Sequence, residues 1–334
     1  MRLFALFISV VAIWVFSGCS TKEYYEPETV KAEWPVGKYL SAPIVDSTAD
    51  GAVLEGGRII TKNGVEDFTL PEGYQYVGTS DNWIVASKIN GDLLLTSVSD
   101  ANRSEVFHLK KTIAAASVQD DIVAVLFASD DMALYSLSTK ELLLKEQGNP
   151  PTAVDSRIVN PYFLGNLVLF LTLDGKIVIV NSDTKELLRS MIVSSEDHFN
   201  NIIYFNVIDN NMVAGTGNRL FALSGKERRE PYELRDVIYN KEGIWISTKQ
   251  GEVIALTPSL QLKTKTKFRF AHFLGMIVAK DNIYLLEKEG FLIVLKKDMQ
   301  SFDVYEVDFE DGYVFVTDKG FYVNDELIDI SNVQ

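Results

Sequence analysis

Short apolar runs of four to six residues alternate with polar turns along most of the chain after residue 50. The fullest copy of this pattern spans 165–188: a polar turn, the apolar run 167–171, the turn Asp174-Gly175 and a second apolar run, 177–180. The runs are rich in β-branched and aromatic residues, and turn residues bound them, as expected for strands joined by hairpins. Helical periodicity is absent beyond the first eighteen residues, so the pattern predicts an all-β protein.

The pattern repeats at a nearly constant spacing. Its Gly or Asp turns lie at positions 57, 91, 131, 175, 217, 251, 290 and 320, about 38 residues apart on average. This spacing suits a β-propeller blade of four short strands. Eight turns favour eight blades. Seven blades remain the alternative if the two terminal units merge into one sheet, although these units together hold about six strands, more than one blade needs.

The last unit lacks an obvious first strand, because only 308–312 lie between Val307 and Tyr313. We expect an N-terminal segment around 38–45 to supply the missing strand and close the ring. Closure would remove exposed sheet edges that otherwise promote aggregation.

The first eighteen residues are typical of a signal peptide. Arg2 gives a positive start, and 3–16 is apolar apart from Ser9. This stretch of fourteen residues is too short to cross a bilayer core of about 30 Å comfortably as a helix, but it suits the central region of a signal peptide. The alternative is an uncleaved anchor helix with a buried cysteine, which the polar sequence after Cys19 disfavours.

Phe16, Ser17, Gly18 and Cys19 resemble the lipobox of bacterial lipoproteins, with Phe16 in place of the usual Leu. The resemblance implies cleavage before Cys19 and a covalent lipid on its thiol. Ser20 in place of Asp implies sorting to the outer membrane, facing the periplasm. We therefore expect a signal peptide over 1–18, a lipidated N-terminus and polar tether over 19–49 whose later part docks on the fold, and a propeller over 50–334.

The charge balance excludes some partners. The chain has 32 Lys and Arg against 46 Asp and Glu, a formal net charge of −14. An acidic surface repels phosphate backbones, so we expect no nucleic acid partner, and it opposes broad adhesion to anionic lipid. Cys19 is the only cysteine, which excludes an intrachain disulfide.

Few residues suggest metal or catalytic chemistry. Three isolated histidines, His108, His198 and His272, do not make a zinc site. The pairs Asp120-Asp121 and Asp130-Asp131 could bind Ca²⁺, but solvated turns at blade ends are the favoured interpretation. His198 follows two acidic residues in a polar loop, where we expect it to be exposed. No nucleophile-elbow pattern is present, since 215–217 reads as a hairpin turn.

One stretch carries alternating cations: Lys263, Lys265, Lys267 and Arg269. In a strand, a period of two places all four on one face. They form either a basic strip for an acidic partner or, the favoured alternative, the solvated face of an outer blade strand. Phe268, Phe270 and Phe273 would then fall on or near the core side.

The hairpin at 174–175 and the turn at 182–185 resemble the PQQ-type propeller repeat, with Lys185 in place of its Gly and no Trp at its docking position. Together with the lipobox, the repeat resembles BamB, the propeller lipoprotein family of the outer-membrane β-barrel assembly machine. This resemblance implies a non-enzymatic scaffold that contacts BamA, without a cofactor. The alternatives are a glycan-associated envelope protein and a quinoprotein or hydrolase enzyme. The mature chain lacks the vicinal cysteine pair of the quinoprotein dehydrogenases.

Overall fold

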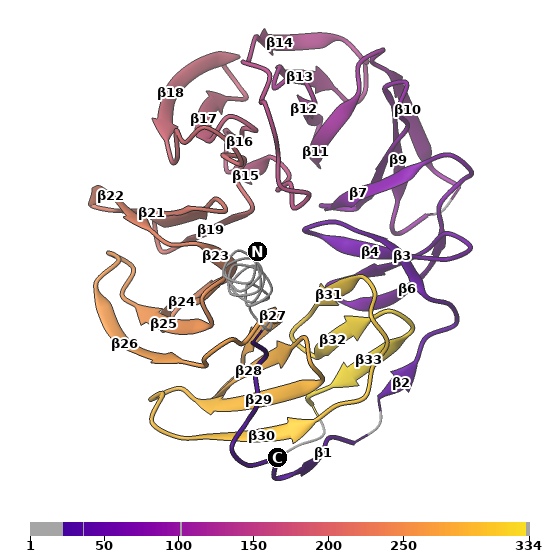
Figure 1. Ribbon diagram of the computed structural model, residues 1–334. Helices are drawn as coiled ribbons and strands as arrows, with labels where there is room; N and C mark the ends of the chain where they lie inside the picture. The colour runs from indigo at the N-terminus through magenta and orange to yellow at the C-terminus, as the bar shows by residue number, and fades with distance from the viewer. Residues whose placement is uncertain (1–22, 36, 101, 332–334) are drawn as a thin grey trace, which may run out of the picture.

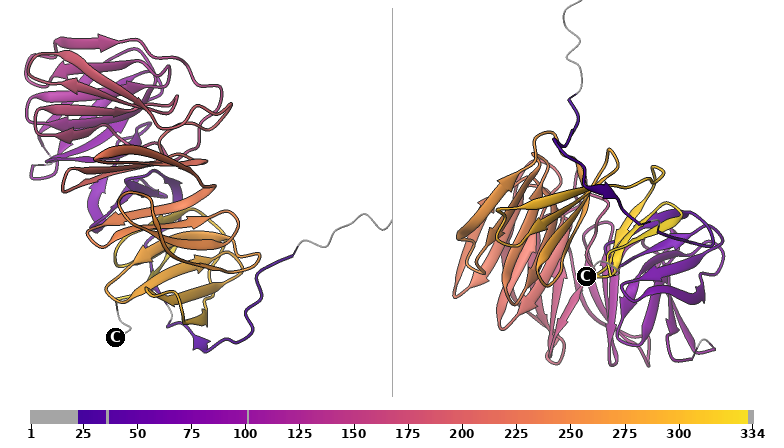
Figure 2. Two further views of the ribbon diagram at one scale, coloured as in Figure 1. Left: turned by 90° about the vertical axis from the view of Figure 1, so that its left-hand side faces the viewer. Right: turned by 90° about the horizontal axis from the view of Figure 1, so that it is seen from below.

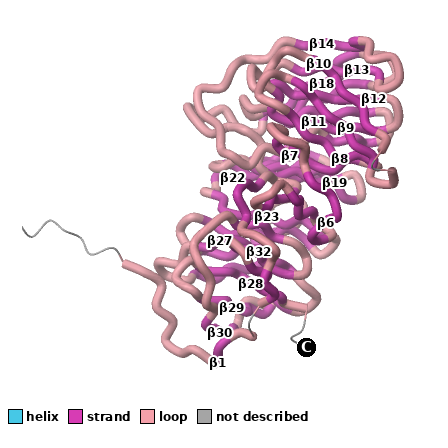
Figure 3. The backbone as a smooth tube through the Cα atoms, turned by 90° about the vertical axis from the view of Figure 1, so that its right-hand side faces the viewer, coloured by secondary structure: helices cyan, strands magenta, loops and turns pink. Residues whose placement is uncertain are grey.

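The computed structural model describes residues 23–35, 37–100 and 102–331. All regular elements within these ranges are β-strands (Figure 3). They form eight small sheets arranged in a ring (Figure 1). The prediction of an all-β propeller with eight blades is therefore confirmed, and seven blades are excluded. No helix in the described ranges is long and apolar enough to cross a membrane. The expected signal peptide and Cys19 lie outside the described residues.

The blades follow one another along the chain, and the first strand of each blade, which we call its inner strand, lies nearest the centre of the ring. Blade 1 comprises β3 (Ile44–Ser47), β4 (Gly51–Leu54), β5 (Arg58–Thr61) and β6 (Gly64–Thr69), and blade 2 comprises β7 (Gln75–Ser80), β8 (Trp83–Ser87), β9 (Asp92–Ser97) and β10 (Ser104–His108). Blade 3 comprises β11 (Ile113–Gln119), β12 (Ile122–Phe127), β13 (Met132–Ser136) and β14 (Leu142–Glu146), and blade 4 comprises β15 (Tyr162–Leu164), β16 (Leu167–Leu171), β17 (Lys176–Asn181) and β18 (Glu186–Ile192). Blade 5 comprises β19 (Tyr204–Ile208), β20 (Asn211–Gly215), β21 (Arg219–Ser224) and β22 (Lys226–Pro231), and blade 6 comprises β23 (Leu234–Asn240), β24 (Gly243–Thr248), β25 (Glu252–Leu256) and β26 (Leu262–Lys267). Blade 7 contains β27 (Phe273–Val278), β28 (Asn282–Glu287), β29 (Phe291–Lys296) and β30 (Phe302–Glu306), and blade 8 contains β31 (Val314–Val316), β32 (Gly320–Val323) and β33 (Glu326–Asp329).

The core lies between the faces of neighbouring blades. The second strand of a blade is buried on both faces, as β8 is along its whole length, whereas an outer strand such as β26 is largely exposed. Phe170 packs between blades 3 and 4, and Phe221 between blades 4 and 5; both are fully buried. Gly175 closes the second hairpin of blade 4 at φ +91°, and a Cβ there would lie 2.5 Å from the Ser194 carbonyl oxygen. This packing explains why the apolar runs of the sequence are continuous rather than alternating.

The ring closes differently from the sequence-based expectation. Blade 8 has its own inner strand, β31, and the N-terminal segment supplies its outermost strand instead, β2 (Lys38–Tyr39), which pairs antiparallel with β33. The expectation that 38–45 would provide the first strand is corrected on this point, because the three residues of β31 suffice to line the channel. Ile44 then begins the inner strand of blade 1, before residue 50, where the sequence places the propeller boundary.

Residues 23–35 and 37–43, which we call the N-terminal strap, cross one end of blade 7 and then follow the outer strands of blades 7 and 8 (Figures 1 and 2). β1 (Ala32–Glu33) adds a fifth strand to blade 7, parallel to β30. Trp34 is 5% exposed and packs edge-on against Tyr305, with ring centroids 4.9 Å apart. Much of the segment expected as a tether is therefore part of the folded body.

Candidate functional site

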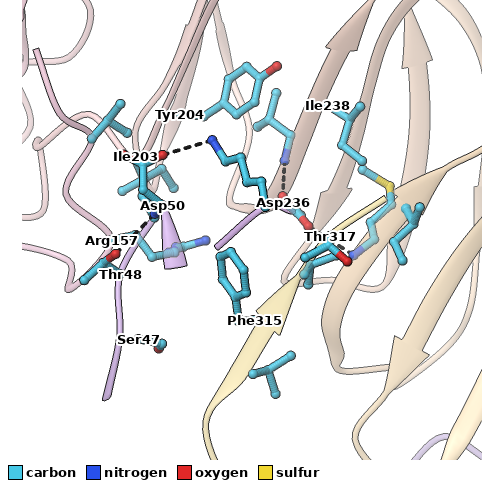
Figure 4. Close-up of a pocket in the computed structure, with 18 of the residues that line it drawn as sticks. Ser47, Thr48, Asp50, Arg157, Ile203, Tyr204, Asp236, Ile238, Phe315 and Thr317 are labelled. Carbon is cyan, nitrogen blue, oxygen red and sulfur yellow. Dashed lines mark hydrogen bonds and ion pairs between the residues drawn. The ribbon is translucent and has the colours of Figure 1, made fainter. Parts of the chain in front are cut away.

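A cavity of about 710 Å³ lies at the centre of the ring. The inner strands of blades 1, 5, 6, 7 and 8 line it, and Figure 4 shows Tyr204, Asp236 and Phe315 around it. At one mouth it is bordered by Asp50, which forms an ion pair with Lys62 at 2.9 Å. The cavity therefore joins apolar walls to charged groups, an arrangement common in binding sites.

Inner strands leave one row of backbone N–H and C=O groups facing the channel, and side chains from adjacent blades satisfy some of them. Asp236 accepts hydrogen bonds from the backbone N–H groups of Val237, at 2.8 Å, and Met276, at 3.0 Å. It thereby joins blades 6 and 7. Burial raises the pKa of Asp236 to about 6, although these N–H groups and the charge of Arg157 oppose the shift.

Residues 147–161, the connection between blades 3 and 4, reach toward the centre of the ring, and we call them the crossing loop (Figure 1). Asn160 donates to the Asp50 carboxylate at 2.6 Å and to the Val77 carbonyl at 3.0 Å, while its own oxygen accepts from the N–H of Ala116. One side chain thus ties the loop to blades 1, 2 and 3.

The crossing loop also carries an arginine to the channel wall. Arg157 forms two hydrogen bonds with Asp155, of 3.0 and 2.8 Å, and donates to the backbone carbonyl of Arg235. Burial alone would raise the pKa of Asp155, but the hydrogen bonds and charge of Arg157 outweigh it and lower that pKa. The two residues form an ion pair that fixes the loop against blade 6.

Arg235, at the start of β23, is only partly satisfied by hydrogen bonds. Its Nε is buried and has no hydrogen-bond partner among the described residues, while its terminal nitrogen contacts His272 Nε2 at 2.5 Å. Burial, and secondly the charge of Arg157, lowers the pKa of Arg235. A buried donor without a partner is costly, so Arg235 holds this position at an energetic cost.

The structure separates the two aspartate pairs proposed for Ca²⁺. Asp121 lies in the β11–β12 turn and accepts from Ser136, which lowers its pKa. Asp130 and Asp131 lie at the opposite end of the sheet, and both are buried. No group of three metal-binding side chains occurs within the described ranges.

The second pair does not match the interpretation of solvated turns. Asp130 accepts from the N–H of Leu173, at 2.6 Å, and therefore links blade 3 to blade 4. Asp131 pairs with Lys111 at 2.5 Å and accepts from the N–H of Gly148. Asp131 therefore fastens the base of the crossing loop, while Asp130 joins blades 3 and 4. The hydrogen bonds of both carboxylates offset the cost of their burial.

Asp130 gives a test of this role through pH. Burial raises the pKa of Asp130 well above its ordinary value, so the folded state holds its proton more tightly than the unfolded state. The stability it contributes is present below its unfolded pKa and is lost as pH rises through the folded pKa. We expect the free energy of unfolding, measured by urea denaturation, to fall less between pH 5 and pH 8 in Asp130→Asn than in the parent protein.

Asp131→Asn is the matched control. Hydrogen bonding to Lys111 lowers the pKa of Asp131, so its contribution is present above its unfolded pKa and is lost only in more acidic solution. This variant should be less stable by a similar amount at pH 5 and pH 8. An unchanged pH slope in Asp130→Asn would show that Asp130 stays ionised in the fold.

The three histidines lie apart, as the sequence indicates. His108 Nδ1 lies 2.7 Å from Asp92, and His272 contacts Arg235. His198 is exposed, as expected, and its Nδ1 lies 3.2 Å from the Thr152 hydroxyl of the crossing loop. None of these positions brings two histidines together.

The alternating cations have the expected orientation in part. Lys263, Lys265 and Lys267 are exposed on one face of β26, the outer strand of blade 6. Arg269 lies beyond the strand, in the loop to blade 7. Phe268 and Phe273 are buried, but Phe270 is 44% exposed, so its expected place on the core side is corrected: the chain turns there at φ +63°.

Sequence reasoning missed the residues that meet at the channel, chiefly Arg157, Asn160, Asn201 and Arg235. Each is a single polar residue without a local motif. One signal was available: the 147–161 connection is long for a join between blades and contains Pro150 and Pro151. Long ordered loops are frequently functional.

No protein-family model matches this chain. Two similar curated proteins are both named plasminogen-binding protein PgbB, from Helicobacter pylori strains J99 and 26695. They are 27% identical over 346 residues and 28% identical over 347 residues, each covering 90% of this chain. The chain spans 64% and 63% of the length of these relatives.

Three solved structures have the same fold. BamB from Moraxella catarrhalis superimposes with a TM-score of 0.66 at 15% identity, covering 87% of this chain and 96% of that one. The computationally designed Ika8 protein gives 0.58 at 15% identity, covering 88% and 96%. The C-terminal WD40 domain of Sif2 gives 0.60 at 13% identity, covering 86% and 92%. At these identities, the likeness concerns the fold alone.

Proposed function

We propose that this chain is a protein-binding propeller of the cell envelope, held at a membrane by a lipid on Cys19. The observation that carries the proposal is the similarity over 90% of the chain to two proteins named for binding plasminogen, a protein ligand. Because the propeller makes up most of this chain, we infer that the propeller is the binding element. A binding role, without catalysis or cofactor, also agrees with the scattered histidines and the structural use of Asp130 and Asp131.

The matching experiment has two arms. The lipoprotein is captured in mild detergent from its own membranes and its partners are identified by mass spectrometry, and the purified protein is titrated with plasminogen in biolayer interferometry. We expect a specific protein partner in at least one arm. A Cys19→Ala chain reports capture that does not depend on the anchor. Recovery of no protein above background together with no plasminogen binding would overturn the proposal.

A second candidate function is a BamB-like role in outer-membrane β-barrel assembly, with BamA as the partner. The specific observation in its favour is the combination of the lipobox at Cys19 with a fold that superimposes on BamB over 96% of that chain. The capture experiment distinguishes the candidates, because this one requires BamA among the recovered proteins. Localisation in the outer membrane, facing the periplasm, is common to both and is tested by membrane fractionation.

A further inference from the structure

One end of blades 6 and 7 carries exposed cations around an exposed aromatic ring. Lys249 lies in the β24–β25 turn, Arg269 and Phe270 lie in the β26–β27 connection, and Lys288 lies in the β28–β29 turn. In antiparallel sheets these turns are all at the same end. With Lys267, the last residue of β26, they form what we call the anchor-side patch.

The anchor-side patch surrounds a depression of about 320 Å³, lined by Lys249, Lys267, Arg269 and Phe270. The guanidinium of Arg269 lies 5.0 Å from the centre of the Phe270 ring. None of the four cations of the patch takes part in an ion pair between described residues. Lys249 interacts electrostatically with Asp155, and Lys288 lies between Glu287 and Glu289 in the sequence. Lys267 and Arg269 therefore carry the charge that is most available to an external anion.

This charge stands out against an acidic protein. The whole chain has a net charge of −14, yet 234–272 contains seven Lys and Arg against three Asp and Glu, a local excess of four positive charges. Electrostatic attraction acts over about 10 Å at moderate ionic strength. An approaching surface therefore responds to the local charge of blade 6, while the acidic remainder opposes docking by other faces.

The chain enters the fold beside this patch. Tyr25, 7% exposed, packs edge-on between Phe268 at 6.2 Å and Phe291 at 5.8 Å, measured between ring centroids. Phe268 immediately precedes Arg269, and Phe291 follows the turn that contains Lys288. Burial raises the pKa of Tyr25 to about 12, which agrees with a ring held inside the fold.

The length of chain before Tyr25 limits its distance from a membrane. Cys19 precedes Tyr25 by six residues, which even a fully extended chain spans in roughly 20 Å. A lipid on Cys19 therefore keeps this end of blades 6 and 7 close to the bilayer, whatever path the segment takes. Figure 2 shows the indigo stretch from residue 23 onward at one face of the ring.

We propose that the anchor-side patch docks on anionic phospholipid head groups of the membrane that holds the Cys19 lipid. Lys249, Lys267, Arg269 and Lys288 attract the phosphates, and Phe270 enters the interface as aromatic anchors do. The acyl chains raise the local concentration of the patch at the bilayer, so weak contacts suffice. The opposite ends of the blades then face protein partners. This inference rests on the proposed lipid anchor.

The absence of any cysteine other than Cys19 makes the test specific, because the lipid blocks that thiol. Two variants, Phe270→Cys and Val98→Cys, are purified as lipoproteins and labelled with an environment-sensitive NBD fluorophore. Val98 is the control, because it is exposed in blade 2 at the end opposite to the anchor-side patch. Each is reconstituted into phosphatidylcholine vesicles with or without 30% phosphatidylglycerol. We expect NBD emission at position 270 to rise at least twofold with the anionic lipid and to remain unchanged at position 98.

A charge-reversed patch tests the cause. Phe270→Cys combined with Lys249→Glu, Lys267→Glu and Arg269→Glu should lose the increase. Phe270→Cys combined with Lys226→Glu, Arg228→Glu and Lys280→Glu, which carries the same charge change at exposed positions outside the patch, should keep it. Circular dichroism establishes that each variant folds.

Two failures are distinguishable. Mass spectrometry of the N-terminal peptide reports acylation, and a chain without lipid on Cys19 would overturn both the anchor and this inference. If the protein is acylated and vesicle-bound but NBD emission at position 270 does not change with anionic lipid, the docking alone would be overturned. Quenching of that label only when a protein partner is added would assign the patch to the partner instead.

Discussion

Replacing Trp34 with alanine should lower the free energy of unfolding by about 3–5 kcal/mol, the usual range for a large aromatic residue removed from a core. Trp34 lies in the N-terminal strap, far in sequence from everything it contacts. Its ring packs edge-on against Tyr284 and Tyr305, and its indole N–H donates to the Asp329 carbonyl at 3.1 Å. The residue therefore connects blade 7 to the last strand of blade 8. Chemical denaturation followed by far-ultraviolet circular dichroism measures the loss.

Tyr39→Ala is the matched control, because Tyr39 belongs to the same strap but is 73% exposed. It should change stability by less than about 0.5 kcal/mol, as surface substitutions usually do. Hydrogen exchange should rise at β30 and β33 in Trp34→Ala, since both strands would lose the cover of β1 and β2. Equal effects of the two substitutions would show that the strap contributes little to closure of the ring.

The sequence predicts the middle strands of each blade well because residues close together in the sequence determine them. A run such as 167–171 is apolar on both faces and is bounded by turn residues, so it can only be a buried strand. The number of blades follows from counting the Gly or Asp turns of the repeat. The same reasoning applies to the outer strands, where the exposed lysines of β26 show the period of two.

The edges of the ring are less predictable because they depend on partners distant in sequence. β2 pairs with β33, and the two strands lie near opposite ends of the sequence. No property of Lys38 or Tyr39 shows which strand lies beside them. Trp34 in a polar, Pro-containing stretch is the one sequence signal that the segment is folded. Phe270 illustrates the converse, since alternation predicts burial where a left-handed turn exposes the ring.

The channel residues could not be predicted for the same reason. Asp236 binds the backbone of blade 7, and Asn160 binds those of blades 2 and 3. An isolated Asn or Asp in a strand or loop has no pattern that reveals which backbone group it will meet. Such contacts become visible only when the blades are placed side by side.

Asn201 is a further residue that holds the crossing loop in place, and it is fully buried. Its side-chain oxygen accepts from the N–H of Asp155 at 2.7 Å, and its amide donates to the carbonyls of Asp155 at 3.1 Å and Arg157 at 3.3 Å. One side chain on the connection between blades 4 and 5 thus satisfies three backbone groups of the loop. The loop in turn carries Arg157 to the channel mouth.

Asn201→Ala should therefore destabilise the protein by at least about 2 kcal/mol, because each buried polar group left unpaired costs about 1–3 kcal/mol. The damage should be local: hydrogen exchange of 150–161 should increase at least tenfold while that of the middle strands β16 and β17 stays unchanged. Asn149→Ala, at an exposed position of the same loop, should alter neither quantity. If the loop kept its protection in Asn201→Ala, then Asn160 and the Arg157–Asp155 pair would suffice to hold it, and its attachment would not depend on the connection between blades 4 and 5.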